Sequence, residues 1–113
     1  MEIIFATKKM QKIMNNECEM QKVYGQHRAR KLQRVLYSLR AVSTLAELGA
    51  PYSPPHRCHE LTGDKKRLLS LDLDHPYRLL FEPYHDPIPT KEDGGLDWSK
   101  ITCIKVLSIT DTH

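Results

Sequence analysis

Two histidines and an arginine stand out because their side chains can transfer protons and hold an anion. His59 lies two residues after Arg57 in a stretch that alternates like a strand, so both side chains are expected on one face of a sheet. His113 follows closely on a strongly apolar stretch that would hold it near the sheet. Histidine titrates near neutral pH and can accept or donate a proton. Either ring could equally be an ordinary side chain satisfied by its neighbours.

Arg78 lies among the alternating apolar residues of 77–81 and is expected to point away from the face that they line. An arginine on an inner strand is costly unless it is paired or lies in an open cleft. Its planar guanidinium binds phosphate through two parallel hydrogen bonds and stays charged. The position therefore predicts either a phosphate contact or a structural ion pair, with Asp72 and Glu82 as candidate partners.

Charge is unevenly distributed along the 113 residues, although the formal net charge is only +3. The stretch 26–40 has no acidic residue, whereas 82–97 has five acids against one lysine. This polarity favours an anion-binding surface. The cations of the first stretch are Arg28, Arg30, Lys31, Arg34 and Arg40, and a later turn after Gly63 carries Lys65, Lys66 and Arg67. Each set could also be an ordinary solvated surface.

Hydrophobic periodicity predicts the elements that position these groups. A strand is expected at 1–5, a helix from about 8 to 24, and a second helix with its apolar stripe at 29–42, joined to the first at Gly25. Capping-box spacing at Thr44 and Glu47 predicts one more turn before Gly49. Strands are then expected at 57–62, 67–73 and 77–82. A fourth, at 101–109, is expected to be central and buried on both faces.

The resulting order is β-α-α-β-β-β-β, which indicates an α+β fold with a helical hairpin on one face of a mostly antiparallel sheet. The length fits one domain spanning residues 1–113. The segment 83–100, rich in proline and glycine, is expected to be irregular. Neither a membrane helix nor a signal peptide is predicted, so the chain is expected to be cytoplasmic.

Cysteine spacing argues against a disulfide framework and against a metal centre. Cys18, Cys58 and Cys103 form an odd set without paired spacing, so we expect buried thiols in a reducing compartment. Neighbouring Cys58 and His59 would point to opposite sheet faces, which leaves no convincing ligand set with His56, His85 or Cys103. No glycine-rich phosphate loop occurs either. We therefore expect no metal site.

The element order and four short stretches resemble the RelE/ParE toxin superfamily, and most closely its HigB-type members, which are also described as plasmid-maintenance killer proteins. The stretches that carry the resemblance are 57–64 (RCHELTGD), 69–73 (LSLDL), 77–81 (YRLLF) and 111–113 (DTH). The resemblance spans nearly the whole chain. It implies a toxin that cleaves messenger RNA, in most members on the ribosome, without a metal or organic cofactor. It also implies a cognate antitoxin of the HigA type with a helix-turn-helix, and a toxin–antitoxin complex that binds operator DNA.

The resemblance also implies roles for particular residues: His59 at the active-site histidine, Arg78 at the phosphate-binding arginine, and Asp111 and His113 at the C-terminal acid and histidine. Arg57, Lys65, Lys66 and Arg67 are expected to contact RNA. The sequence departs from the family pattern at Thr112, where tyrosine is usual, and at Thr62, where lysine is common.

Metal-free RNA cleavage requires one group to take the proton from the ribose 2′-hydroxyl, cations to hold the phosphate charge, and another group to protonate the leaving 5′-oxygen. Which histidine is the base stays open. The alternatives are a non-catalytic ParE-like toxin that binds DNA gyrase, an inactive remnant on the same fold, and a DNA-binding autoregulator. A pure binder would not need His59, Arg78 and His113 to be aligned.

Overall fold

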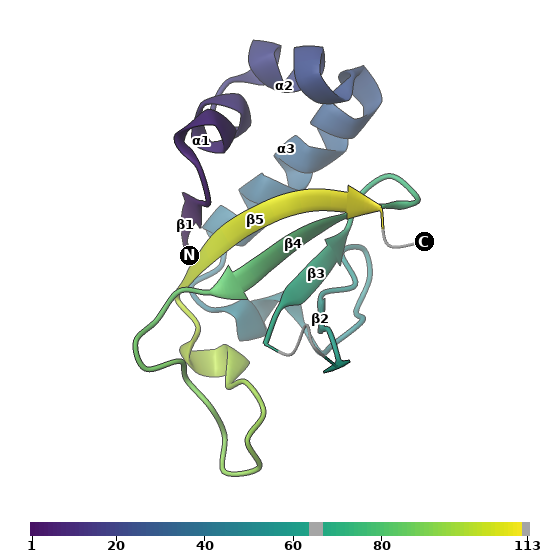
Figure 1. Cartoon of the computed structure of the whole chain (residues 1–113). Helices are drawn as coiled ribbons and strands as arrows, with labels where there is room; N and C mark the ends of the chain where they lie inside the picture. Colours follow the sequence, from purple (N-terminus) through teal and green to yellow (C-terminus); the bar gives the residue numbers. More distant parts are fainter. Residues whose placement is uncertain (64–66, 112–113) are drawn as a thin grey trace.

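A computed structural model describes residues 1–63 and 67–111 of the chain (Figure 1). Within those residues, five strands, three α-helices and two short 3-10 turns follow one another. The strands are β1 (Glu2–Phe5), β2 (His59–Glu60), β3 (Leu69–Asp72), β4 (Tyr77–Pro83) and β5 (Cys103–Asp111). The helices are α1 (Lys8–Met14), α2 (Glu17–Tyr24) and α3 (Gln26–Ala41), and the 3-10 turns are η1 (Leu45–Leu48) and η3 (Trp98–Lys100).

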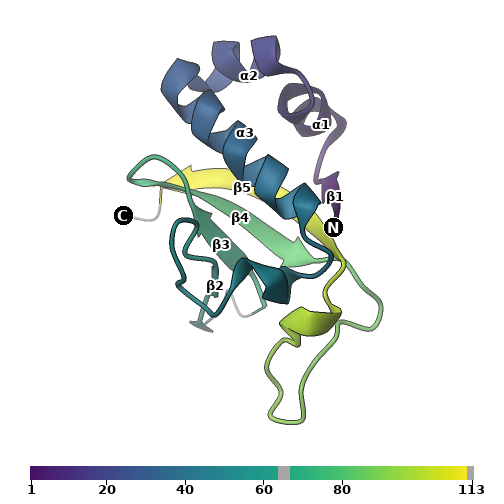
Figure 2. The ribbon, with the colours of Figure 1, turned by 180° about the vertical axis from the view of Figure 1, so that it is seen from behind.

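The five strands form one sheet in the order β1-β5-β4-β3-β2. Only β1 runs parallel to its neighbour, β5, and the other pairs are antiparallel. Helix α3 lies across one face of the sheet (Figure 2), and none of the described helices covers the opposite face, which is seen in Figure 1. The predicted α+β class and its mostly antiparallel sheet are confirmed. One sheet face is thus covered, and the other is open.

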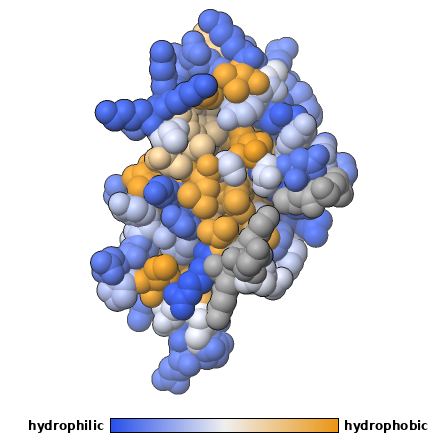
Figure 3. Space-filling model, viewed as in Figure 1, coloured by the Kyte–Doolittle hydropathy of each residue, from blue (hydrophilic) through white to orange (hydrophobic). Residues whose placement is uncertain are grey.

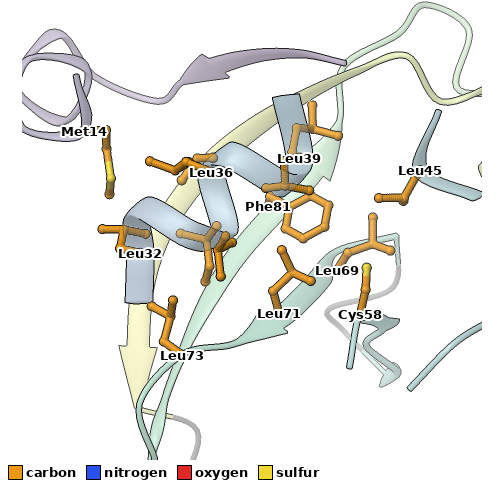
Figure 4. Close-up of a cluster of buried hydrophobic side chains, with 14 of the residues drawn as sticks. Met14, Leu32, Leu36, Leu39, Leu45, Cys58, Leu69, Leu71, Leu73 and Phe81 are labelled. Atoms are coloured by element: carbon orange, nitrogen blue, oxygen red, sulfur yellow. The ribbon is translucent and has the colours of Figure 1, made fainter. Parts of the chain in front are cut away.

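The core lies between α3 and the covered face of the sheet (Figure 4). Leu32, Leu36 and Leu39 of α3 are at most 2% exposed and belong to one buried cluster with Phe81 of β4, which is fully buried. Burying each such side chain is worth about 1.5–3 kcal/mol. The stripe predicted for this helix is confirmed from Ala29 to Leu39. This packing fixes which face of the sheet remains open.

The N-terminal helical region differs from the expectation. The predicted helix at 8–24 is broken at Asn15 and Asn16 into α1 and α2, because the Asn16 side chain accepts a hydrogen bond from the Glu19 N–H at 3.1 Å and caps the second helix. The break turns the apolar face. Met20 is therefore buried, whereas Cys18 is exposed, contrary to the expectation that the cysteines are buried.

Gly25 is the residue at which α2 ends and α3 begins. Its φ of +84° lies in the left-handed region, which glycine adopts without the steric penalty of a Cβ. A Cβ built at this position would meet no atom within 4 Å, so backbone conformation alone selects glycine here. The predicted junction between the helices is confirmed.

Two strand predictions need correction. β5 is an interior strand between β1 and β4 as expected, but it is not buried on both faces, because Ile104 and Val106 are buried while Lys105 between them is partly exposed. β2 is only two residues long, not the six expected for 57–62. Arg57 has a φ of +52°, outside the strand region, so the strand begins after this residue and not at it.

The segment between β4 and β5 is more ordered than expected. An isolated bridge joins Thr90 to Leu96, and η3 follows it. Leu96 and Ile101 are buried and join the core, which anchors both sides of the excursion. The excursion projects from the end of the molecule opposite to α2 (Figures 1 and 2).

Candidate functional site

The open face of the sheet carries most of the predicted site residues. Residues that pair across an antiparallel ladder share a face. Register therefore places His59, Ser70, Leu80 and Ser108 in one row across β2 to β5, and Asp72, Arg78 and Thr110 in the next row. Leu79 and Phe81 point the other way, into the core. His59 and Arg78 thus lie on the same side of the sheet.

His59 is held through both ring nitrogens. Its Nδ1 lies 2.8 Å from the backbone carbonyl oxygen of Arg57, and its Nε2 lies 3.4 Å from the hydroxyl oxygen of Ser70. A carbonyl oxygen can only accept, so Nδ1 carries the proton and donates it. In the neutral ring Nε2 is consequently unprotonated and available as a proton acceptor. This arrangement suits a general base, or a general acid once Nε2 is protonated.

Tyr52 is a site residue that the sequence analysis missed. Its ring stacks on the His59 imidazole with centroids 4.2 Å apart and planes 13° from parallel. The Arg57 guanidinium carbon lies 5.9 Å from the same ring's centroid. Tyr52 comes from the irregular segment that follows η1, where no periodicity assigns a side chain to a face. The available signal in the sequence was an aromatic residue two positions before a double proline, in a segment too irregular to bury it in a helix or strand.

Asp72 connects the two arginines of the site. Arg78 Nη1 donates a hydrogen bond to Asp72 Oδ1, and Arg57 Nε lies 3.8 Å from Asp72 Oδ2. The structural ion pair considered for Arg78 is therefore present. The Arg78 side chain is 27% exposed and the Asp72 side chain 22%, so the pair remains open to solvent. One carboxylate facing two guanidinium groups leaves an excess of positive charge.

A hollow of about 100 Å³ lies next to this ion pair. Arg57, Asp72, His75 and Arg78 line it, together with parts of the β3–β4 turn. His75 lies between the strands predicted at 67–73 and 77–82, in an Asp-His-Pro turn whose sequence gives no indication of which way the ring points. The hollow brings two guanidinium groups and an imidazole around a space open to solvent, an arrangement that suits an anion.

The separation between His59 and Arg78 follows from the sheet geometry. β2 and β4 lie on either side of β3, and Arg78 lies one row further along, so their Cα atoms are roughly 12 Å apart. Arg57 spans the interval, because its carbonyl oxygen contacts His59 and its guanidinium reaches Asp72. The proton-transfer group and the cations can therefore face one bound nucleotide.

Two other predicted residues lie apart from this cluster. Asp111 pairs with Tyr77, whose alternation places it on the side of the sheet opposite to Arg78. Arg67 precedes the strand region on the far side of His59 from Arg78, next to Leu68, which pairs with Leu61. The predicted residues Lys65, Lys66 and His113 lie outside the described residues, as does Thr112.

The basic face predicted for α3 divides into two groups. Arg28 Nε bonds both carboxylate oxygens of Asp74, at 3.0 and 3.1 Å, and its guanidinium lies 3.5 Å from the centroid of the Tyr77 ring. Burial alone would lower the pKa of Arg28, but the hydrogen bond and charge of Asp74 outweigh it and raise the pKa. Arg28 therefore joins α3 to the β3–β4 turn. Arg30 and Arg34 are exposed, beside Tyr37, which is 76% exposed.

The residues weighed for a metal site have other surroundings. Burial raises the pKa of the Cys58 thiol to about 12 and so disfavours the thiolate that binds metals. His85 Nε2 accepts hydrogen bonds from the backbone N–H groups of Thr102 and Cys103, at 3.1 and 3.3 Å. Within residues 1–63 and 67–111, no three histidine, cysteine or acidic side chains gather as a metal ion would require.

Apolar side chains also reach the open face (Figure 3). Leu80 shares its row with His59 and Ser70 and is only partly buried. A register shift after Leu80 leaves Leu107 as an extra residue of β5, and this leucine is partly buried as well. The open face thus has an apolar floor beside its charged end.

Among the described helices, none is long and apolar enough to cross a membrane.

Comparison with known proteins yields a similarity in structure alone. The sequence matches no protein-family model and no curated protein. The structure is similar to that of the YoeB/ParE toxin from Agrobacterium tumefaciens, with a TM-score of 0.56, 10% sequence identity and complete coverage of both chains. At this identity the likeness establishes the fold, which is that of a YoeB/ParE-like toxin. It does not by itself identify the HigB branch.

Proposed function

We propose that this chain is the toxin of a type II toxin–antitoxin system and acts as an endoribonuclease on messenger RNA. The observation that supports the nuclease activity best is the placement of His59, with an unprotonated Nε2 in its neutral form, on the same open face as Arg57 and Arg78. The toxin fold of the structural neighbour supports the wider assignment. The resemblance of the sequence motifs to HigB-type toxins supports the narrower assignment to a toxin that cleaves messenger RNA.

The reaction begins at the ribose 2′-hydroxyl, which loses its proton to a histidine while its oxygen forms a bond to the adjacent phosphorus. The bond from phosphorus to the 5′-oxygen breaks, and that oxygen takes a proton from a second group. The products are a 2′,3′-cyclic phosphate and a 5′-hydroxyl end. DNA lacks the nucleophile, so the activity is restricted to RNA by its chemistry.

His59 and His113 are the proposed proton-transfer pair, in either order. Arg57 and Arg78 hold the phosphate, since fixed cations are worth most where charge builds up in the transition state. Asp111 is proposed to orient His113, which follows it by two positions. Arg67, Lys65 and Lys66 are proposed to extend the contact with RNA. No step in this scheme requires a metal or an organic cofactor.

The proposed partners are a HigA-type antitoxin with a helix-turn-helix, messenger RNA on the ribosome, and, for the toxin–antitoxin complex, operator DNA. The apolar floor around Leu80 and Leu107 suits coverage by a protein segment, which would also block the cations beside it. The exposed Arg30 and Arg34 of α3 suit the phosphate backbone of ribosomal RNA.

The proposal is tested by inducing His59→Ala and Arg78→Ala variants in bacteria while growth and total messenger RNA are followed. We expect both variants to relieve growth arrest and to stop RNA loss, with folding checked by circular dichroism. His27→Ala is the matched control, because His27 is exposed on α3. Full toxicity with intact RNA would favour a ParE-like toxin that binds gyrase, and full toxicity with RNA loss would overturn the residue roles.

A further inference from the structure

Tyr52 is an exposed aromatic residue held in an uncommon conformation. Its φ of +67° lies in the left-handed region, which costs a residue with a Cβ roughly 1–2 kcal/mol. The side chain is 54% exposed, so burial does not explain why it is held there. Its backbone N–H donates to the Cys58 carbonyl oxygen at 3.0 Å, which closes the loop back onto the residue before His59.

That loop brings Tyr52 flat against the His59 ring. The imidazole is therefore fixed in three ways: at Nδ1 by the Arg57 carbonyl, at Nε2 by the Ser70 hydroxyl, and over one face by the Tyr52 ring. The Ser70 contact is long, at 3.4 Å, and holds the ring only weakly. A ring rotated by half a turn would move Nδ1 away from the carbonyl and change which nitrogen is protonated. To rotate, the imidazole must first tilt out of its plane, and the Tyr52 ring stacked against it opposes that tilt.

We propose that Tyr52 is a positioning residue that holds the His59 imidazole in the Nδ1–H tautomer, which keeps Nε2 as the proton acceptor. The inference rests on the proposed nuclease function, and it adds a residue that the resemblance did not assign. Arg57 belongs to the same unit, since it supplies the carbonyl to His59 and its guanidinium lies near the Tyr52 ring. One loop thereby aligns a proton-transfer group and a cation.

The test compares Tyr52→Leu, which removes the ring, with Tyr52→Phe, which keeps it. Tyr84→Leu is a matched control: Tyr84 is 53% exposed, and the Lys105 Nζ lies 5.9 Å from its ring centroid, much as the Arg57 guanidinium carbon lies 5.9 Å from the Tyr52 ring. Two quantities are measured on the full chain. The ¹⁵N chemical shifts of His59 report the tautomer, and cleavage of an RNA oligonucleotide gives kcat and KM.

We expect Tyr52→Leu to show a mixture of His59 tautomers and a kcat lowered by roughly 10- to 100-fold at little change in KM, as misplacing a reacting group does. Tyr52→Phe should keep the wild-type tautomer and most of kcat, and Tyr84→Leu should change neither quantity. A wild-type tautomer together with wild-type kcat in Tyr52→Leu would overturn the proposal. A rise in KM alone would also overturn it, because Tyr52 would then be binding substrate.

The chemical-shift measurement separates this inference from the proposed function. If the wild-type chain does not cleave RNA, the nuclease proposal fails, and the catalytic role of Tyr52 fails with it. The tautomer mixture in Tyr52→Leu would in that case still establish that the stack holds the ring. An unchanged tautomer in Tyr52→Leu would also refute the claim that Tyr52 holds the His59 ring.

Discussion

Asp72 controls how much positive charge the open face presents, because it faces both Arg57 and Arg78. In the free protein it satisfies the guanidinium groups, and a bound phosphate would compete with it for them. The same ion pair is compatible with a purely structural role for Arg78. Two substitutions at this pair can separate the two roles.

We predict that Arg78→Ala lowers RNA cleavage by about 100-fold or more, the usual effect of removing a group that stabilises transition-state charge. Asp72→Asn breaks the same ion pair but keeps the guanidinium, and should leave cleavage within roughly ten-fold of wild type. Both should cost at most about 1–2 kcal/mol of unfolding free energy, since the pair is partly solvated. Equal losses of cleavage in the two variants would reduce Arg78 to a structural residue.

His56 gives the protein a pH-dependent stability. Burial and then the nearby charge of Lys31 lower its pKa below the ordinary value of 6.5. The unfolded chain therefore binds this proton more readily, so the stability present above pH 6.5 is lost as the pH falls from that value through the lower pKa of the folded protein. We predict that the urea midpoint drops between pH 7.5 and 5.5, and that it drops less in His56→Gln. An equal drop in both proteins would exclude His56 as a cause.

Among single residues, alternation along the strand was sufficient to predict that Arg78 points away from the apolar face of its strand. That His59 shares this side of the sheet follows from the register between strands, which the sequence does not specify. The reasoning for Arg57 was incomplete, since its left-handed backbone removes it from the strand, and it reaches the cluster by another route. Tyr52 and His75 could not be predicted, because they lie in segments where side-chain direction depends on turn geometry and not on a repeating pattern.

At the level of elements, Asn15 and Asn16 divide what the apolar spacing indicated as a single helix. Helical spacing alone cannot reveal the break, because both segments keep the same period and only their phase changes. Asparagine is, however, a preferred N-cap residue, and two in succession are the local signal of a new helix start.

We predict that Asn16→Ala destabilises the protein by about 1 kcal/mol, the usual cost of losing a cap side chain. Asn16→Asp should be neutral or slightly stabilising, since aspartate accepts the same hydrogen bond and suits the positive end of the helix dipole. Thermal unfolding of the two variants and the wild type measures both effects. An unchanged melting temperature in Asn16→Ala would show that the cap contributes nothing.

Helix α3 carries two kinds of arginine, and they should respond differently to substitution. Arg28→Ala removes the bonds to Asp74 and the stacking on Tyr77, and we expect it to cost about 1–3 kcal/mol of stability. Arg30→Ala and Arg34→Ala should leave stability within about 0.5 kcal/mol. Each should instead lower the salt dependence of RNA binding by about one ion. Salt-series binding measurements in which only Arg28→Ala changed that slope would contradict this division.

At the scale of the whole molecule, the covered and open faces of the sheet define where function can lie. α3 and the core occupy one side, so chemistry is confined to the open face and its rim. The sequence predicted which segments form strands, but not that β1 lies parallel to β5 at the edge of the sheet, because no local pattern specifies pairing between distant segments. The bridge between Thr90 and Leu96 in the excursion between β4 and β5 could not be predicted for the same reason.

Analysis of the RNA ends tests the central proposal most directly. Purified protein is incubated with a labelled RNA oligonucleotide and with its DNA counterpart. The masses of the fragments, measured by mass spectrometry, identify their end groups. We predict a 2′,3′-cyclic phosphate on one fragment and a 5′-hydroxyl on the other, loss of both products in His59→Ala, and an intact DNA strand. Fragments with 5′-phosphate ends, or full cleavage by His59→Ala, would contradict a proton-transfer site centred on His59.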